Sequence, residues 1–278
     1  MPRQGKKKVI LSNFPYQRLG SSTNKTYICN HNLETQTLTM RISLFSFLAV
    51  LVLTFTSCAS QYNIDGNSSL ACLDGKKLYL RTKSYAQQST HTINLDSCVV
   101  IHGRFSFGGN ADSITLAEVY MEDQILMPVV IEGGELLMQV DNYGQTVTGG
   151  PLNERLTEFM QRRLRYSSEL WELERKARKL LFSGVPIEQV EAQFAPKRDA
   201  IVQKIEDLEV KFVLDNHNNA LGTGYFMQLA DQLGFPTMSA QLRRIVEKAP
   251  ASFLRNPQVS NYLFLAGYTP TKQQKVRK

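Results

Sequence analysis

The sequence predicts an α+β protein in which an N-terminal antiparallel β-sandwich is followed by an α-helical hairpin and short helices. Two observations lead to this class. Between residues 61 and 150, short segments alternate apolar and polar side chains and are separated by Gly, Asn and Asp, which is typical of strands and turns. From Pro151 onward, apolar residues recur at the spacing of an amphipathic helix instead.

The first region contains a series of segments with the length and alternation of strands. Phe105 and Phe107 alternate with Ser106, so one face of that strand is apolar and we expect both phenylalanines in the core. The paired glycines between segments are typical of β-turns. We place the sandwich in residues 58–150, with strands in YNIDG, KKLYLRT, HTINLD, GRFSFGG, ITLAEVYM, LMPVVIEGG, ELLMQVDN and QTVTGG.

The helical region is predicted over residues 151–268. Proline is well tolerated in a first helical turn, so a long helix can begin at Pro151. The turn FSGVP at 182–186 separates it from a second amphipathic helix, which we expect Pro196 to bend or interrupt. The segment NHNNALGTG closes this hairpin at 216–224, shorter helices are expected near 225–233, 238–248 and 252–265, and the basic tail 269–278 is expected to be disordered.

Residues 40–57 have the composition of an export signal. Met40 and Arg41 precede fourteen uncharged, mostly apolar residues at 42–55, and small residues follow up to Cys58. A helix of this length rises about 21 Å, less than the roughly 30 Å hydrocarbon core of a bilayer. The pattern therefore favours a cleaved signal peptide over a permanent membrane span.

The end of this segment, Phe55-Thr56-Ser57-Cys58, resembles the lipobox of bacterial lipoproteins, although Phe55 stands where leucine is usual. The resemblance implies cleavage between Ser57 and Cys58 and lipidation of Cys58, with palmitate among the acyl chains. An ordinary secretory signal with a coincidental cysteine is the alternative. Residues 59–62 contain no acid of the kind that retains lipoproteins at the inner membrane. We therefore expect an outer-membrane lipoprotein that faces the periplasm.

The positive charge of the chain lies mostly before Cys58. The net charge is +7, and residues 1–57 hold seven of the 32 bases but one of the 25 acids. The near-neutral remainder, together with export, excludes nucleic acid as the expected partner. Residues 1–39 show no periodic apolar pattern, so we expect untranslated sequence upstream of Met40 or a disordered leader. A long cytoplasmic leader is the alternative.

Four short segments in the sandwich region carry a resemblance: DS at 96–97, GRFSFG at 103–108, PVVIEGG at 128–134 and VTGGPLN at 147–153. Their order resembles domain of unknown function 4369, a β-rich domain that precedes thioredoxin-like or peroxide-reductase-like domains in lipoproteins of Gram-negative bacteria. The helices up to residue 224 resemble the connector of such proteins. In those relatives a CxxC domain follows, but no CxxC motif occurs here. The resemblance therefore implies the non-catalytic part of that architecture and no catalytic residue.

After Cys58, the remaining thiols are Cys72 and Cys98. A disulfide between them would stabilise the fold by roughly 3–4 kcal/mol in an oxidising compartment. Two buried free cysteines at strand positions is the interpretation that the apolar neighbours of Cys98 favour. Their spacing excludes a CxxC redox pair.

Other candidate chemical groups do not form a recognisable motif. The histidines after Cys58 are scattered, with no HxH or HExxH spacing, so neither a metal nor a cofactor is predicted. The acidic pairs Glu122-Asp123 and Glu206-Asp207 are expected to be solvated. Trp171 is expected to contact the core or the hairpin. The basic residues around it are expected to be solvated, because interspersed glutamates weaken their field; contact with an anionic lipid or an acidic partner is the alternative.

We therefore expect a lipid-anchored envelope protein that is not an enzyme and acts as a binding or scaffolding module. Its expected partners are the membrane, through the N-terminal lipid, and an envelope protein or a second copy. The alternative is an accessory to envelope thiol-redox or peroxide-stress chemistry that acts with a separate thioredoxin-like protein.

Overall fold

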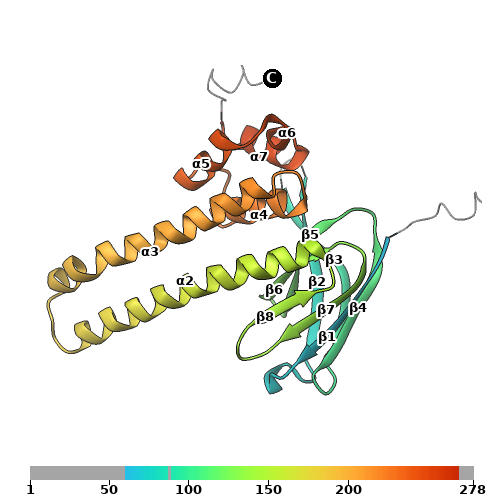
Figure 1. Cartoon of the computed structure of the whole chain (residues 1–278), viewed down its shortest axis with the longest axis horizontal. Coiled ribbons are helices and arrows are strands. Elements are labelled where there is room, and N and C mark those ends of the chain that lie inside the picture. The colour runs from blue at the N-terminus through green and yellow to red at the C-terminus, as the bar shows by residue number, and fades with distance from the viewer. Residues whose placement is uncertain (1–59, 87–88, 269–278) are drawn as a thin grey trace, which may run out of the picture. The chain divides into compact units, whose positions relative to one another are not determined.

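The computed structural model describes residues 60–86 and 89–268 (Figure 1). The expected leader, the signal peptide, Cys58 and the basic tail lie outside these residues. Among the residues described, no helix is both long and apolar enough to cross a membrane. The described part is α+β, as the sequence predicts, with strands first and helices after them.

Two four-stranded sheets form the first part, in the orders β4-β1-β7-β8 and β3-β2-β5-β6. We call them the first and the second sheet. All pairings are antiparallel except that between β1 and β7, which is parallel and was not anticipated. The strands are β1 Ser60–Ser68, β2 Lys77–Ala86, β3 Ser89–Val99, β4 Arg104–Ala111, β5 Thr115–Met121, β6 Gln124–Ile131, β7 Gly134–Val140 and β8 Gln145–Thr148, with a short 3₁₀ helix η1 at Ala71–Leu73.

The inner faces of the two sheets share one apolar core. Phe105 and Phe107 are buried in it, as predicted, with their rings edge to face at 5.9 Å. Phe105 lies directly over Gly66, where a Cβ would approach its ring to 2.1 Å. The core also includes Ile64, Leu78, Leu80, Val119, Val129, Leu136, Met138 and Val147.

At β5 the second sheet is covered on both faces, which explains why apolar side chains lie on both faces of this strand. Ala117 and Val119 of β5 belong to the sandwich core, while Leu116 packs on the helical core on the opposite face. Strand β5 contacts α4. Because both faces are buried, Glu118 and Tyr120 are also buried on the helix side, and polar groups there need partners within the protein.

The helices follow the predicted order. They are α2 Pro151–Phe182, α3 Ile187–Asp215, α4 Ala220–Asp231, α5 Ala240–Lys248, α6 Ala251–Leu254 and α7 Pro257–Leu265. Helices α2 and α3 lie side by side as a long hairpin that extends away from the sheets (Figure 1). Pro196 lies inside α3 and does not interrupt it. A small cluster of Ala177, Val190 and Phe194 packs toward the far end of this hairpin.

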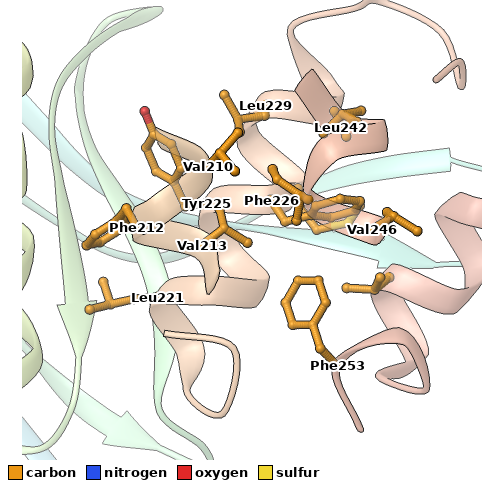
Figure 2. Close-up of a cluster of buried hydrophobic side chains, with 14 of the residues drawn as sticks. Val210, Phe212, Val213, Leu221, Tyr225, Phe226, Leu229, Leu242, Val246 and Phe253 are labelled. Atoms are coloured by element: carbon orange, nitrogen blue, oxygen red, sulfur yellow. The ribbon is translucent and has the colours of Figure 1, made fainter. Parts of the chain in front are cut away.

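A second core joins the short helices to the base of the hairpin (Figure 2). Phe226 of α4 is fully buried at its centre, and its ring lies 5.7 Å from that of Phe253 and 5.9 Å from that of Tyr262, both edge to face. Phe212 stacks on Phe159 at 3.8 Å, which ties α3 to α2. These contacts hold α4 against α6 and α7, and α3 against α2.

Candidate functional site

A cleft of about 700 Å³ lies between the second sheet and helices α4, α6 and α7. Strands β2 and β5 supply one wall, and the start of α4, with the loop before it, supplies another. Asn219 caps the start of α4 by accepting a hydrogen bond from the Leu221 N–H at 2.9 Å, and Asn256 caps α7 in the same way through Gln258 at 3.0 Å. Two helix starts therefore border the cleft.

Glu118 is one of the residues that line this cleft. It is 8% exposed and accepts hydrogen bonds from the Tyr120 hydroxyl at 2.6 Å and from Gln228 Nε2 of α4 at 2.8 Å. The two donors satisfy one oxygen each, as a buried carboxylate requires. Glu118 thus fastens α4 to the second sheet.

Two basic side chains of β2, Arg81 and Lys83, line the cleft. The Lys83 ammonium lies 2.5 Å from Asp231 Oδ2 at the end of α4, and the Arg81 guanidinium lies over the rings of Tyr79, at 4.4 Å, and Tyr120, at 5.0 Å. Burial and the hydrogen bond to Glu118 raise the pKa of Tyr120, so its phenol stays protonated at neutral pH. The charged groups of the cleft are thus held by protein partners.

The groups that a ligand would meet are therefore mainly hydroxyls, amides and short apolar side chains. Ile114 in the β4–β5 loop and Thr115 of β5 line the cleft together with Thr223, Ser252 and Gln258 of the helices. Ile114 is 54% exposed at this site. Such a lining can exchange hydrogen bonds with a polypeptide backbone and accept apolar side chains.

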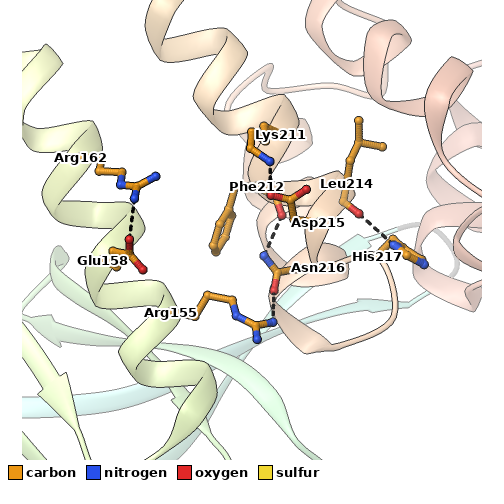
Figure 3. A network of polar contacts seen from close by, with 9 residues as sticks. All are labelled: Arg155, Glu158, Arg162, Lys211, Phe212, Leu214, Asp215, Asn216 and His217. Carbon is orange, nitrogen blue, oxygen red and sulfur yellow. Dashed lines mark hydrogen bonds and ion pairs between the residues drawn. The ribbon is translucent and has the colours of Figure 1, made fainter.

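A second, smaller cleft of about 370 Å³ lies between α2 and α3 (Figure 3). At its base, Asn216 is 1% exposed, donates to the Phe212 carbonyl at 2.8 Å and accepts from Arg155 of α2 at 2.9 Å. Asn219 also donates to Asn216 at 3.2 Å. A Cβ on Gly222 would lie 2.2 Å from the Asn216 carbonyl oxygen. The NHNNALG segment thus serves to join three helices closely.

The motif segments at 128–134 and 147–153 meet where α2 leaves the sandwich. Asn153 is fully buried, and its side-chain amide accepts from the Val130 N–H and donates to the Val130 carbonyl, both at 2.8 Å. Glu132 accepts from the backbone N–H groups of Leu152, at 3.1 Å, and Asn153, at 2.9 Å. Asn153 thus completes the outer edge of β6, and the Glu132 carboxylate caps the start of α2.

The segments at 96–97 and 103–108 meet in a similar way. Asp96 accepts from the Ser97 N–H at 2.7 Å and from the Gly108 N–H at 2.9 Å, which links β3 to β4. All four motif segments therefore have a structural role at junctions between elements. None of them supplies a side chain to the 700 Å³ cleft.

A second buried carboxylate lies among the helices and was not singled out from the sequence. Glu209 is 4% exposed and accepts from Arg163 Nε at 2.7 Å, the Tyr225 hydroxyl at 2.9 Å and Gln241 Nε2 at 2.6 Å. Burial and the nearby Glu209 carboxylate raise the pKa of Tyr225. This network joins α2, α3, α4 and α5.

Cys72 and Cys98 are both free thiols in the structure. Cys98 lies in β3 and is partly buried, and burial raises its pKa to about 11. The expectation of a buried strand position is wrong for Cys72, which is exposed in η1 because its neighbour Leu73 takes the buried position of that turn. The spacing of Cys72 and Cys98 in the sequence could not show that Cys72 is exposed.

The remaining candidates from the sequence lie outside the cleft or at its border. Glu122 lies in the β5–β6 turn, exposed, 3.4 Å from Lys76. Asp207 is exposed and bonds Arg244 and Gln203. His217 borders the cleft. In residues 60–86 and 89–268, no three His, Cys, Asp or Glu side chains gather as metal ligands would.

Of the two contacts expected for Trp171, the core contact is wrong, because the side chain is 57% exposed on α2. Arg175, four residues later, lies 5.7 Å from its ring. On a two-helix hairpin only one face of each helix is covered by the other, and Trp171 lies outside that face.

The fold and its cleft define a class: a two-sheet sandwich followed by a helical hairpin and a set of short helices, of which α4 packs on the second sheet. Residues 62–156 match the family described as Domain of unknown function (DUF4369). The matched segment runs from β1 into the first turns of α2 and so includes both Glu132 and Asn153. No curated protein matches the chain.

Proposed function

We propose that this protein is a lipid-anchored envelope protein whose folded part is a non-enzymatic binding module, and that its 700 Å³ cleft holds a polypeptide segment of a partner protein. The cleft is the single observation that carries the binding proposal. Its volume lies within the usual range of ligand sites, and its charged groups are held by hydrogen bonds and ion pairs within the protein.

The state of those charged groups favours binding over acid–base catalysis. Glu118 already accepts two hydrogen bonds, and Lys83 is paired with Asp231. A general acid or base must be able to exchange a proton with a substrate, whereas these groups hold α4 on the sheet. A cleft braced in this way would lose little conformational entropy when a partner segment binds.

The envelope part of the proposal rests on the sequence between Met40 and Cys58. An apolar segment with a charged start and a small-residue end is typical of an export signal, and the lipobox resemblance implies attachment through Cys58 to the outer membrane, facing the periplasm. Metabolic labelling with palmitate tests this part alone. Label should enter the protein and disappear in Cys58→Ala, and label retained in that variant would contradict the anchor.

The binding part is tested by site-specific photo-crosslinking in intact cells of the native host. A photo-reactive phenylalanine analogue would replace Ile114 at the cleft, and Tyr143, which is 95% exposed in the β7–β8 turn, is the matched control position. We expect a discrete adduct from position 114 that Thr223→Trp abolishes by filling the cleft. Equal adducts from both positions, or an adduct that survives Thr223→Trp, would refute the cleft proposal.

The accessory role in thiol-redox chemistry is a second proposal, and the match of residues 62–156 to the β-rich family supports it. The chain's own Cys98 is a poor nucleophile, because burial raises its pKa to about 11. Cys72 is exposed, but the sequence has no CxxC motif, so in this proposal the redox centre is a CxxC pair of the partner. A CxxC protein recovered as the position-114 adduct would favour this role, and any other partner would exclude it for this cleft.

A further inference from the structure

The end of the α2–α3 hairpin exposes apolar side chains that the fold does not use. We define residues 181–187 as the hairpin tip. Within it, Phe182 is 90% exposed, Ile187 58% and Leu181 37%. The small core nearby is completed by other residues, since Leu180 and Val185 pack on Ala177, Val190 and Phe194. Neither Phe182 nor Ile187 is therefore required to close the hairpin.

The turn is formed by local interactions that do not require large apolar side chains. Ser183 Oγ donates to the Leu180 carbonyl at 2.8 Å, and Gly184 has φ +87°, a conformation suited to glycine after a helix end. Pro186 precedes α3 as its N-cap. Polar residues at 182 and 187 would suit this turn equally well, so their apolar character needs another explanation.

Positive charge accompanies the tip. Lys176, Arg178 and Lys179 are exposed in the last two turns of α2, and none of them forms an ion pair with a described residue. The nearby Arg175 is paired with Glu172, and Glu191 is paired with Arg198. Glu188 is the one acid that adjoins the tip residues in α3, so the surroundings carry a positive excess.

The size and shape of the tip favour a lipid surface over a protein partner. Three side chains at a convex turn bury at most a few hundred Å², because a large aromatic side chain contributes about 150–250 Å². A stable protein interface buries roughly 1,200–2,000 Å². A bilayer needs no matching pocket, and apolar side chains next to lysine and arginine are typical of segments that enter the boundary between head groups and acyl chains.

We propose that the hairpin tip docks on a lipid bilayer with anionic head groups, with Phe182 and Ile187 entering the interface and Lys176, Arg178 and Lys179 contacting the head groups. This contact is separate from the lipid on Cys58 and goes beyond the binding role of the cleft. It would give the protein a second attachment point at the end of its longest helices.

The single tryptophan of the chain makes the depth of the tip measurable. Trp171 precedes Phe182 by eleven residues, which is about 16 Å along a helix, whereas interfacial segments enter only about 5–10 Å. Trp171→Phe combined with Phe182→Trp therefore moves the fluorescent reporter to the tip. Trp171→Phe combined with Tyr143→Trp is the matched control, since Tyr143 is 95% exposed on the sandwich.

The full chain with each reporter would be mixed with vesicles of phosphatidylcholine alone or with phosphatidylglycerol, each containing brominated acyl chains. We expect the reporter at position 182 to shift to the blue and to be quenched several-fold more than that at 143, with a larger effect in phosphatidylglycerol. Lys176→Gln, Arg178→Gln and Lys179→Gln together should remove that lipid dependence, while the helical circular dichroism stays unchanged.

Equal quenching at the two positions would overturn the proposal, because it would show that the whole chain adsorbs without preference for the tip. A reporter at 182 that shifts to the blue only as protein concentration rises would also overturn it in favour of a second copy as occupant. Both outcomes leave the palmitate and cleft experiments unaffected, so failure here is distinct from failure of the proposed function.

Discussion

Asn153 offers the sharpest test of how the sandwich and the helices are joined. Its side chain is fully buried and makes three hydrogen bonds of 2.8 Å, two to the backbone of Val130 and one to Glu132. Val130 is itself fully buried on the outer strand β6. Asn153→Ala therefore leaves a buried N–H and a buried carbonyl without partners.

Each unpaired buried group costs about 1–3 kcal/mol, so we expect Asn153→Ala to lower the free energy of unfolding by about 2–6 kcal/mol. Urea unfolding followed by circular dichroism measures this as a lower midpoint. Asn153→Asp keeps the size of the side chain but replaces its NH₂ donor with a carboxylate oxygen. This oxygen would face two acceptors, the Val130 carbonyl and the Glu132 carboxylate. At neutral pH, Asn153→Asp should lower the free energy of unfolding at least as much as Asn153→Ala. This decrease should be smaller in acid, where a protonated carboxyl can donate again.

Asn63→Ala is the matched control, because Asn63 is exposed on β1 and surface substitutions usually change stability by less than about 0.5 kcal/mol. If Asn153→Ala and Asn63→Ala unfold at the same urea concentration, the reasoning that Asn153 completes the edge of β6 is refuted.

Three further predictions concern other residues of the sandwich and the helices. Glu209→Gln should destabilise by about 3–5 kcal/mol in urea unfolding, because it leaves Arg163 without its carboxylate; an unchanged midpoint would contradict this. Gly149→Ala should cost about 1–3 kcal/mol, since Gly149 has φ +100° and its Cβ would meet the Glu135 carbonyl oxygen at 2.4 Å; an equally stable variant would contradict the crowding. Burial raises the pKa of Cys98 from 9.0 to about 11, so alkylation in the folded protein should run about 100-fold slower at pH 8 than for an unshifted thiol and should accelerate up to pH 11. Mass spectrometry would reveal an early Cys98 adduct if this is wrong.

Periodicity in the sequence was enough to predict the order of strands and helices, because most elements have one apolar face. The change of period at Pro151 coincides with the start of α2, and the alternation at Phe105 and Phe107 correctly assigned their burial. Local patterns of this kind depend on residues close in the chain, which a single sequence displays directly.

Roles that depend on distant residues could not be read in the same way. Glu118 and Glu122 lie four residues apart, yet Glu118 is buried by α4 and Glu122 is exposed in a turn. Nothing in the residue type separates them, because the difference comes from a helix that begins about a hundred residues later. The same limit hid the cleft, whose walls come from β2, β5, α4, α6 and α7.

The parallel pairing of β1 also has a mechanical meaning. Strand β1 begins two residues after Cys58 and runs between β4 and β7, bonded along its length to both. A pull transmitted through the N-terminus would act along β1 and would have to shear two hydrogen-bonded ladders at once, whereas an edge strand can be peeled away one bond at a time. The strand nearest the expected tether is thus among the best placed in the sandwich to bear load.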